Sequence, residues 1–170
     1  MRKNDVKSFD VEAATQKAYR LLSLRPHSEK ELEKKLREKG FPAVVVKETL
    51  EKLHDLKYLN DTSFARQWAR NLAVNKLWGD KKIAASLREK GIGDDLINAA
   101  VETARGEVSE EEAIERLIQK KAARRKKAAL DFKEKQKIFR ALMGRGFPPG
   151  MILNKLGRIE KEAIDDDDGK

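Results

Sequence analysis

Most of the side chains that could do chemistry in this chain are cationic. Six of the eight residues from 120 to 127 are Lys or Arg, and four more basic residues follow closely. The ten residues are Lys120, Lys121, Arg124, Arg125, Lys126, Lys127, Lys133, Lys135, Lys137 and Arg140. Ammonium and guanidinium groups at this density attract polyanions, of which nucleic acid is the leading candidate. We predict that these side chains contact DNA phosphates or an acidic partner surface.

Positive charge is concentrated in one stretch of the chain, whose formal net charge is +9. Residues 113–159 contain 14 Lys and Arg against 3 Asp and Glu, which is +11. Residues 1–112 contain 22 against 20, and residues 160–170 contain 2 against 6. A lysine-rich helix often presents only a solvated face. The unbalanced excess favours a surface that faces a polyanion through contacts that salt would weaken.

Residue types typical of catalysis and metal binding are scarce. The two histidines, His27 and His54, lie beside expected helix starts without a third ligand at metal-binding spacing, so we expect them to be exposed or to cap helices. The chain has no cysteine, and the glycine-rich residues 144–150 fit a turn between helices rather than a phosphate-binding loop. We expect the carboxylates of Asp165–Asp168 to lack the fixed geometry that a metal site needs. We expect no catalytic residue, no metal site and no cofactor.

A secondary candidate contact near the middle of the chain consists of Arg70, Trp78 and Lys82. Trp78 lies just before a glycine, where one helix is expected to give way to the next. Its indole could pack at that junction, which we favour, or stack on a base of single-stranded nucleic acid. Trp68 lies four residues after Phe64, so we expect both on the buried face of one helix.

A segment that occurs three times indicates how these residues are positioned. Its copies are residues 36–41, 87–92 and 142–147, and their glycines Gly40, Gly91 and Gly146 are 51 and 55 residues apart. Four residues before each glycine is a leucine, and eight residues before it is a leucine or isoleucine. This spacing places two apolar residues on one helix face, and a glycine suits the left-handed position that ends a helix. The pattern predicts an array of small helical repeats.

Each repeat is expected to contain three helices. The first helices are predicted over residues 11–24, 62–78 and 109–130. The side chains expected to cap helix starts are Ser28 with Glu31 as a capping box, Asp80, and Ser109 ahead of Glu112. The third helices are expected to begin near Pro42, residues 93–94 and residues 148–149.

The sequence predicts an all-α fold, an elongated curved array of three tandem three-helix repeats. The predicted repeats are residues 11–60, 61–108 and the basic 109–159. Residues 1–10 and the acidic tail 160–170 are expected to be disordered. Neither a secretory signal nor an apolar stretch of 18 residues is recognisable, so we expect no membrane contact. A cysteine-free, highly charged chain favours the cytoplasm.

All three repeats resemble the RecX family of bacterial regulatory proteins. The residues that carry the resemblance are His27–Glu29, Glu31, Leu32, Leu36 and Lys39–Phe41, then Leu59–Asp61, Phe64, Ala65, Trp68, Arg70, Trp78, Gly79, Lys82, Ile83, Leu87 and Lys90–Ile92, and finally Phe132–Ile138, Leu142 and Arg145–Phe147. The match runs in order over about residues 12–159. The first ten residues and the acidic tail have no counterpart in it.

The resemblance implies a non-enzymatic modulator of the RecA recombinase. Such proteins bind RecA, above all its nucleoprotein filament, and inhibit strand exchange, ATP hydrolysis and coprotease activity, which restrains recombination and the DNA-damage response. Leu36, Leu87 and Gly91 would be structural, and the resemblance supplies no set of contact residues. Two alternatives remain open: a stand-alone DNA-binding protein that uses one helix–turn–helix pair, and an interaction scaffold without nucleic-acid contact.

Overall fold

In the computed structural model, the described residues are 10–122 and 131–165, and most of them are helical. No strand occurs in those two ranges. The elements are α1 (Val11–Leu24), α2 (Glu29–Glu38), α3 (Ala43–Asp55), α4 (Asp61–Arg70), the π-helical turn η1 (Asn71–Asn75), α5 (Asp80–Glu89), α6 (Asp94–Arg105), α7 (Glu110–Ala122), α8 (Phe132–Met143) and α9 (Pro149–Asp165). None of these helices is long and apolar enough to cross a membrane.

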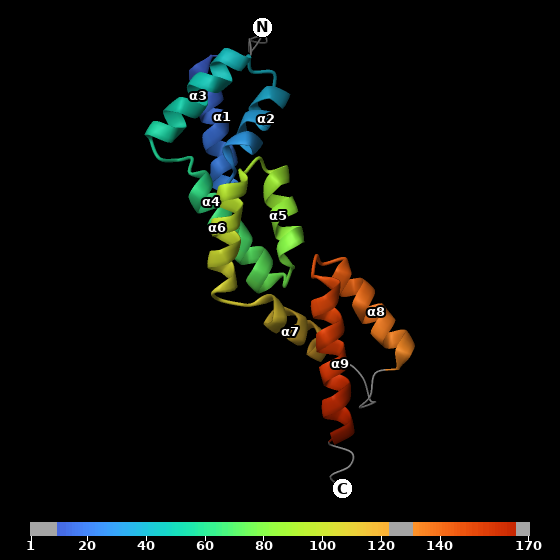
Figure 1. Ribbon diagram of the computed structural model, residues 1–170. Coiled ribbons are helices and arrows are strands. Elements are labelled where there is room, and N and C mark those ends of the chain that lie inside the picture. Colours follow the sequence, from blue (N-terminus) through green and yellow to red (C-terminus); the bar gives the residue numbers. More distant parts are fainter. Residues whose placement is uncertain (1–9, 123–130, 166–170) are drawn as a thin grey trace.

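The helices form three successive groups along an elongated molecule, with the first group at one end and the third at the other (Figure 1). In each group the first and third helices pack together, as α1 on α3, α4 on α6 and α7 on α9. The second helix of each group, α2, α5 or α8, also packs on the third. These contacts confirm the predicted all-α array of tandem three-helix repeats.

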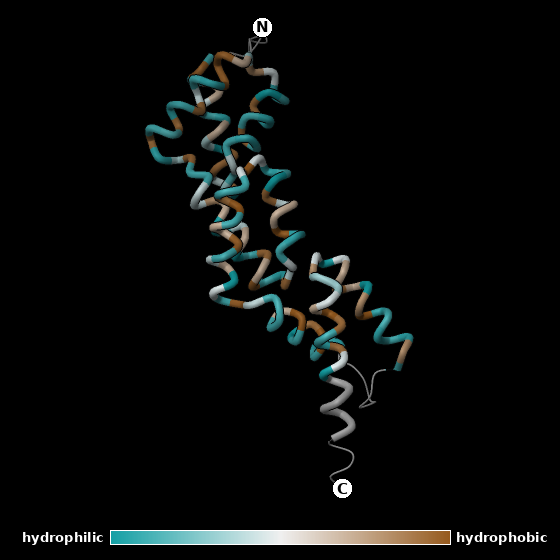
Figure 2. The backbone as a smooth tube through the Cα atoms, in the orientation of Figure 1, coloured by the Kyte–Doolittle hydropathy of each residue, from teal (hydrophilic) through white to brown (hydrophobic). Residues whose placement is uncertain are grey.

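Each repeat buries a thin apolar core of its own, and hydrophilic positions recur along every helix (Figure 2). The predicted pairs of apolar residues four positions apart are all buried, namely Leu32 and Leu36, Ile83 and Leu87, and Ile138 and Leu142. Trp68 packs at the side of the middle core, half-buried rather than inside it. Because each core is thin, a repeat depends on its neighbours for stability.

A glycine in the left-handed region follows the second helix of each repeat. The φ angle is 93° at Gly40, 81° at Gly91 and 90° at Gly146. The amide after each glycine donates to the carbonyl of the leucine four residues before that glycine, at 3.3, 3.1 and 3.4 Å. This Schellman arrangement satisfies carbonyls that would otherwise be unpaired at the helix end. The predicted glycine turns are confirmed.

Two of these turns also contact the second helix of the preceding repeat. A Cβ added at Gly91 would lie 2.2 Å from the Lys30 side chain. A Cβ added at Gly146 would lie 2.6 Å from Cβ of Lys82 and 2.7 Å from its backbone nitrogen. Both positions therefore need glycine for two reasons, the backbone conformation and the close approach of the neighbouring repeat.

The first helix of the second repeat is shorter than the predicted 62–78. α4 passes into the π-helical turn η1, which ends at Asn75, and Leu77 has a left-handed φ of 51°. Val74 and Leu77 pack against the core of the third repeat, so this altered helix end joins two repeats. The first helix of the third repeat is described as far as Ala122, and the remainder of the predicted 109–130 lies outside the described residues.

The predicted helix caps are confirmed in part. Ser109 and Glu112 exchange side-chain and backbone hydrogen bonds as a capping box. The Ser28 hydroxyl accepts the amide of Glu31 at 3.2 Å, but the Glu31 carboxylate pairs with basic side chains instead of completing the box. Asp80 is the first helical residue rather than the N-cap, which is Gly79, and its carboxylate accepts from the guanidinium of Arg105.

The last helix extends farther than predicted. Residues 160–165, which were expected to belong to a disordered tail, continue α9 to Asp165. Glu, Lys and Ala in this stretch are good helix formers, so an acidic composition does not end the helix. At the other end, Asp10 is the N-cap of α1 and accepts the amide of Ala13. Residues 1–9 and 166–170 lie outside the described residues.

Replacing Gly146 by Ala should destabilise the fold by about 2 kcal/mol or more. The left-handed conformation costs a residue with a Cβ about 1–2 kcal/mol, and the overlap with Lys82 adds to this. Gly157→Ala is the matched control, because a Cβ meets nothing there within 4 Å and alanine favours a helix by up to about 1 kcal/mol. Urea denaturation measures both, and equal stabilities of the two variants would contradict the prediction.

Candidate partner-binding surface

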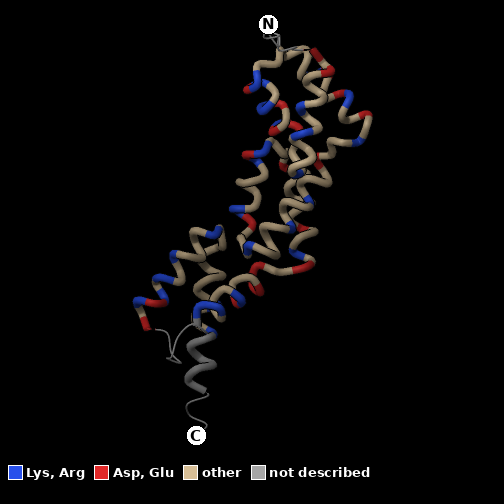
Figure 3. Tube along the Cα trace, turned by 180° about the vertical axis from the view of Figure 1, so that it is seen from behind, with Lys and Arg blue, Asp and Glu red and all other residues tan. Residues whose placement is uncertain are grey.

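The exposed side of α8 carries three of the predicted cations in one row. Lys133, Lys137 and Arg140 are four and three residues apart, so they share a side of the helix, and all three are exposed. We call these three residues the α8 stripe. Ile138 and Leu142 face the other way and hold α8 on the core of the third repeat. Basic positions recur along this helix in the view from behind (Figure 3).

The start of α8 is fixed by a capping box that sequence analysis missed. Asp131 accepts the amide of Glu134 at 2.8 Å, and Glu134 accepts the amide of Asp131 at 3.2 Å. The Asp-x-x-Glu spacing was the available signal. Lys135, one of the predicted contact residues, is half-buried and lies off the α8 stripe.

Lys120 and Lys121 lie in the last turn of α7 and line a cleft together with Arg145, which follows α8. Two of the predicted contact residues, Lys120 and Lys121, therefore share this cleft with a third cation, Arg145, that was not predicted as a contact residue. Arg145 belongs to the repeated segment, whose pattern indicates a structural role, so the sequence gives no signal of a place in this cleft. The four remaining predicted residues, Arg124, Arg125, Lys126 and Lys127, lie outside the described residues.

The three secondary candidates, Arg70, Trp78 and Lys82, each contact other residues of the chain. Arg70 pairs with Glu107 at 2.7 Å, an exposed contact between α4 and the segment after α6. Lys82 donates to the carbonyl of Gly144 in the next repeat at 2.8 Å, and its ammonium lies 4.5 Å from the centre of the Trp78 ring. Trp78 is half-buried against the middle core. The structure therefore favours packing for Trp78, and gives Lys82 a role in joining repeats.

At both repeat junctions, an acidic side chain of one repeat caps the second helix of the repeat before it, a feature that the sequence did not predict. Asp61 accepts the amide of Glu29 at 2.9 Å, and Glu110 accepts the amide of Asp80 at 2.8 Å. Burial raises the pKa of Asp61 and of Glu110. Acidic residues are common in the first turn of a helix because they interact favourably with the dipole of that helix. The sequence therefore carries no separate signal that Asp61 and Glu110 contact a helix of another repeat.

The two histidines have structural partners. His27, expected to be exposed or to cap a helix, is buried, and its Nδ1 lies 2.9 Å from the carbonyl oxygen of Arg25. Burial lowers its pKa, which favours the neutral ring. His54 is exposed, and its Nε2 lies 2.7 Å from a carboxylate oxygen of Glu29. Within residues 10–122 and 131–165, no three His, Asp or Glu side chains gather in a way that could hold a metal ion.

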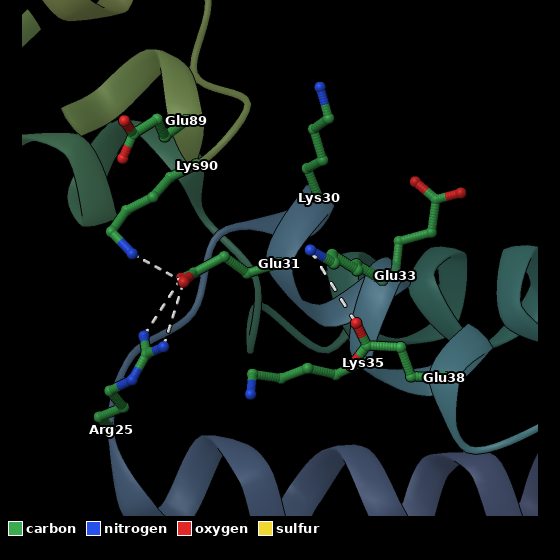
Figure 4. A pocket seen from close by; sticks show the side chains of 9 residues that line it. Arg25, Lys30, Glu31, Glu33, Lys35, Glu38, Glu89 and Lys90 are labelled. Carbon is green, nitrogen blue, oxygen red and sulfur yellow. Dashed lines mark hydrogen bonds and ion pairs between the residues drawn. The ribbon is translucent and has the colours of Figure 1, made fainter. Parts of the chain in front are cut away.

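A groove of about 680 Å³ lies where the first two repeats meet (Figure 4). Glu31 at its centre accepts from Arg25 at 3.1 Å and from Lys90 at 2.7 Å. Burial alone would raise the pKa of Glu31, but these bonds outweigh it and lower the pKa to about 2. Glu33 and other carboxylates share the lining with lysines. A Glu31 that is ionised at neutral pH and held by two cations is unsuited to acid–base catalysis, and the mixed charge is unsuited to a polyanion.

Three stacked three-helix repeats, with cations exposed on the last one, define a helical-repeat protein. Models of the first, second and third three-helix domains of RecX match residues 14–53, 60–101 and 109–156. The chain therefore belongs to the RecX family, whose curated members carry the name regulatory protein RecX.

The relatives match along most of their length. Regulatory protein RecX of Pelodictyon phaeoclathratiforme is 33% identical over 152 residues, which are 89% of this chain and 91% of that protein. The RecX of Syntrophotalea carbinolica is 31% identical over 136 residues, or 80% and 89% of the two chains. The crystal structure of RecX from Lactobacillus salivarius superimposes with a TM-score of 0.74 at 26% identity, covering 89% of this chain and 97% of that one.

Replacing Glu31 by Gln should make stability less sensitive to acid. Because the folded pKa of about 2 lies below the ordinary 4.5, the carboxylate stabilises the fold above about pH 4.5, and this contribution is lost as the pH falls toward 2. The free energy of unfolding, measured by urea denaturation at several pH values, should therefore decrease more steeply across this window for the wild type than for Glu31→Gln. Glu33→Gln, exposed on the same helix, should retain the wild-type slope. Parallel curves for wild type and Glu31→Gln would refute the prediction.

Proposed function

We propose that this protein is a non-enzymatic regulator that binds RecA and its nucleoprotein filament in the cytoplasm. Binding restrains the recombinase, ATPase and coprotease activities of RecA, and so modulates recombination and DNA repair. Membership of a family of regulatory proteins supports the regulatory role. The single observation that carries the contact is the α8 stripe, a row of exposed cations on a helix anchored by a buried face.

The shape and charge of the molecule suit an extended anionic partner. Three repeats in line form a long body, and the surplus of positive charge belongs to the repeat at one end. Cations in a row attract phosphates through long-range electrostatics and release counterions on binding. DNA contact is therefore expected to be weak without RecA and to depend on salt.

The alternative of a stand-alone DNA-binding protein is less well supported. A groove-reading helix–turn–helix needs an accessible turn and an accessible second helix. The turns at Gly91 and Gly146 instead pack against Lys30 and Lys82 of the preceding repeats. An interaction scaffold without nucleic-acid contact would bind its partner with little dependence on salt. Filament binding measured at several salt concentrations therefore distinguishes this alternative from the proposed function.

ATP hydrolysis by RecA on single-stranded DNA should decrease as this protein is titrated in. The expected result is a dose-dependent loss of the steady-state rate, because a regulator that occupies or shortens the filament removes active subunits. A control without RecA should show no hydrolysis by this protein. An unchanged rate at saturating protein would overturn the proposed inhibition.

Removing the α8 stripe should weaken binding to the RecA filament by about tenfold or more at low salt. Lys133→Ala, Lys137→Ala and Arg140→Ala together should also make the plot of log affinity against log salt shallower by about 2, because each contact to a single-stranded phosphate contributes about 0.7. The expected reason is lost phosphate contact rather than altered folding, since all three side chains are exposed.

The matched control removes the same charge from the first repeat, by Arg20→Ala, Lys47→Ala and Lys52→Ala at exposed positions. It should leave affinity and salt slope near wild type. A second variant with alanine at Arg124, Arg125, Lys126 and Lys127 tests the rest of the predicted surface and should act in the same direction as the stripe variant. An equal loss of affinity in the control variant would show that the effect comes from the net charge of the protein and not from the position of the α8 stripe, and would contradict the prediction.

A further inference from the structure

A cleft of about 230 Å³ lies between α7 and α8 in the third repeat. Ile138 and Leu142, which are 4% and 2% exposed, line it together with the half-buried Leu117 and Ala141. Its cationic members are Lys120, Lys121 and Arg145. The cleft therefore combines an aliphatic surface from α7 and α8 with positive charge supplied by the end of α7 and the turn after α8.

The elements around the cleft are anchored to the rest of the array. Arg145 donates to the carbonyl of Lys76 at 2.6 Å, which ties its guanidinium to the second repeat. Ile114 and Ile118 of α7 are 0% and 1% exposed in the core, so the helix that carries Lys120 is fixed as well. A preformed site of this kind loses little freedom on binding.

The lining suits a protein segment better than a nucleobase. Single-stranded nucleic acid is usually held by stacking bases on aromatic rings, whereas the side chains that line this cleft are aliphatic or cationic. An aliphatic surface accepts the apolar anchor of a peptide. Ammonium and guanidinium groups beside it pair with carboxylates that flank such an anchor.

We propose that this cleft binds an acidic amphipathic segment of a protein partner. One apolar side chain lies against Leu117 and Ala141, over the buried Ile138 and Leu142, and flanking Asp or Glu side chains pair with Lys120 and Arg145. The inference rests on the proposed function in one respect, since the partner is then the protein part of the RecA filament. The third repeat thus has two neighbouring surfaces, the α8 stripe for phosphate and the cleft for protein.

Filling the cleft without changing its charge tests this assignment. Ala141→Phe places a ring among the lining residues, and Ala99→Phe, at an exposed position of α6, is the matched control. The probes are a labelled synthetic helical peptide with one Leu between Glu residues, the same peptide with Ser in place of that Leu, a bare single-stranded oligonucleotide, and the RecA filament. Circular dichroism and thermal unfolding check the fold of each variant.

The wild type should bind the Leu peptide at least tenfold more tightly than the Ser peptide. Ala141→Phe should abolish that preference and weaken filament binding about tenfold, while oligonucleotide binding and Ala99→Phe remain near wild type. A second variant, Lys120→Glu, changes an exposed side chain and cannot disturb the core, and it should weaken the Leu peptide at least fivefold.

Several outcomes overturn the inference. They are equal affinity of the wild type for the two peptides, no effect of Ala141→Phe and Lys120→Glu on the Leu peptide, and a loss of oligonucleotide binding in Ala141→Phe equal to the loss of peptide binding, which would place a base in the cleft. The peptide measurements do not involve RecA. A wild type that binds the Leu peptide but not the filament would therefore contradict the proposed function while leaving the cleft as a peptide site.

Discussion

The close approach of each glycine turn to the repeat before it is the constraint on which the array depends. At Gly91 and Gly146 the backbone turns left-handed where the neighbouring repeat leaves no room for a Cβ. One residue therefore ends a helix and brings two repeats into contact. Because each apolar core is thin, these junctions must also contribute to the stability of the whole molecule. They set the positions of all surfaces relative to one another.

The two junctions use the same geometry with different chemistry. At the first, the Ser28 hydroxyl donates to the carbonyl of Lys90 at 2.6 Å, beside the Glu31 carboxylate. At the second, a main-chain contact takes this place, since the amide of Gly79 donates to the carbonyl of Arg145 at 2.8 Å. Charged side chains also cross the second junction, because Lys82 donates to the carbonyl of Gly144 and Glu110 accepts the amide of Asp80. Both junctions therefore combine backbone geometry with charged side chains, whose contribution salt weakens.

Structure that depends on near neighbours in sequence was predictable, and contacts between repeats were not. The left-handed Gly91 and the Ser109 cap involve residues within one or two turns, so spacing and residue type indicate them. The contact of Arg145 with Lys76 joins residues 69 positions apart, and no local pattern encodes it. The candidate site follows the same rule. The α8 stripe follows from helical spacing, whereas the cleft depends on how α7 lies against α8.

The position nine residues before each turn glycine explains why the third repeat is suited to meet a partner. It is Glu31, Lys82 or Lys137 in the three repeats. Glu31 pairs with Lys90 across the first junction, and Lys82 donates to Gly144 across the second. Lys137 is exposed, so the side of the helix that α2 and α5 use for stacking is open in α8. A surface shaped for stacking and lined with positive charge is suited to receive an anionic partner in place of another repeat.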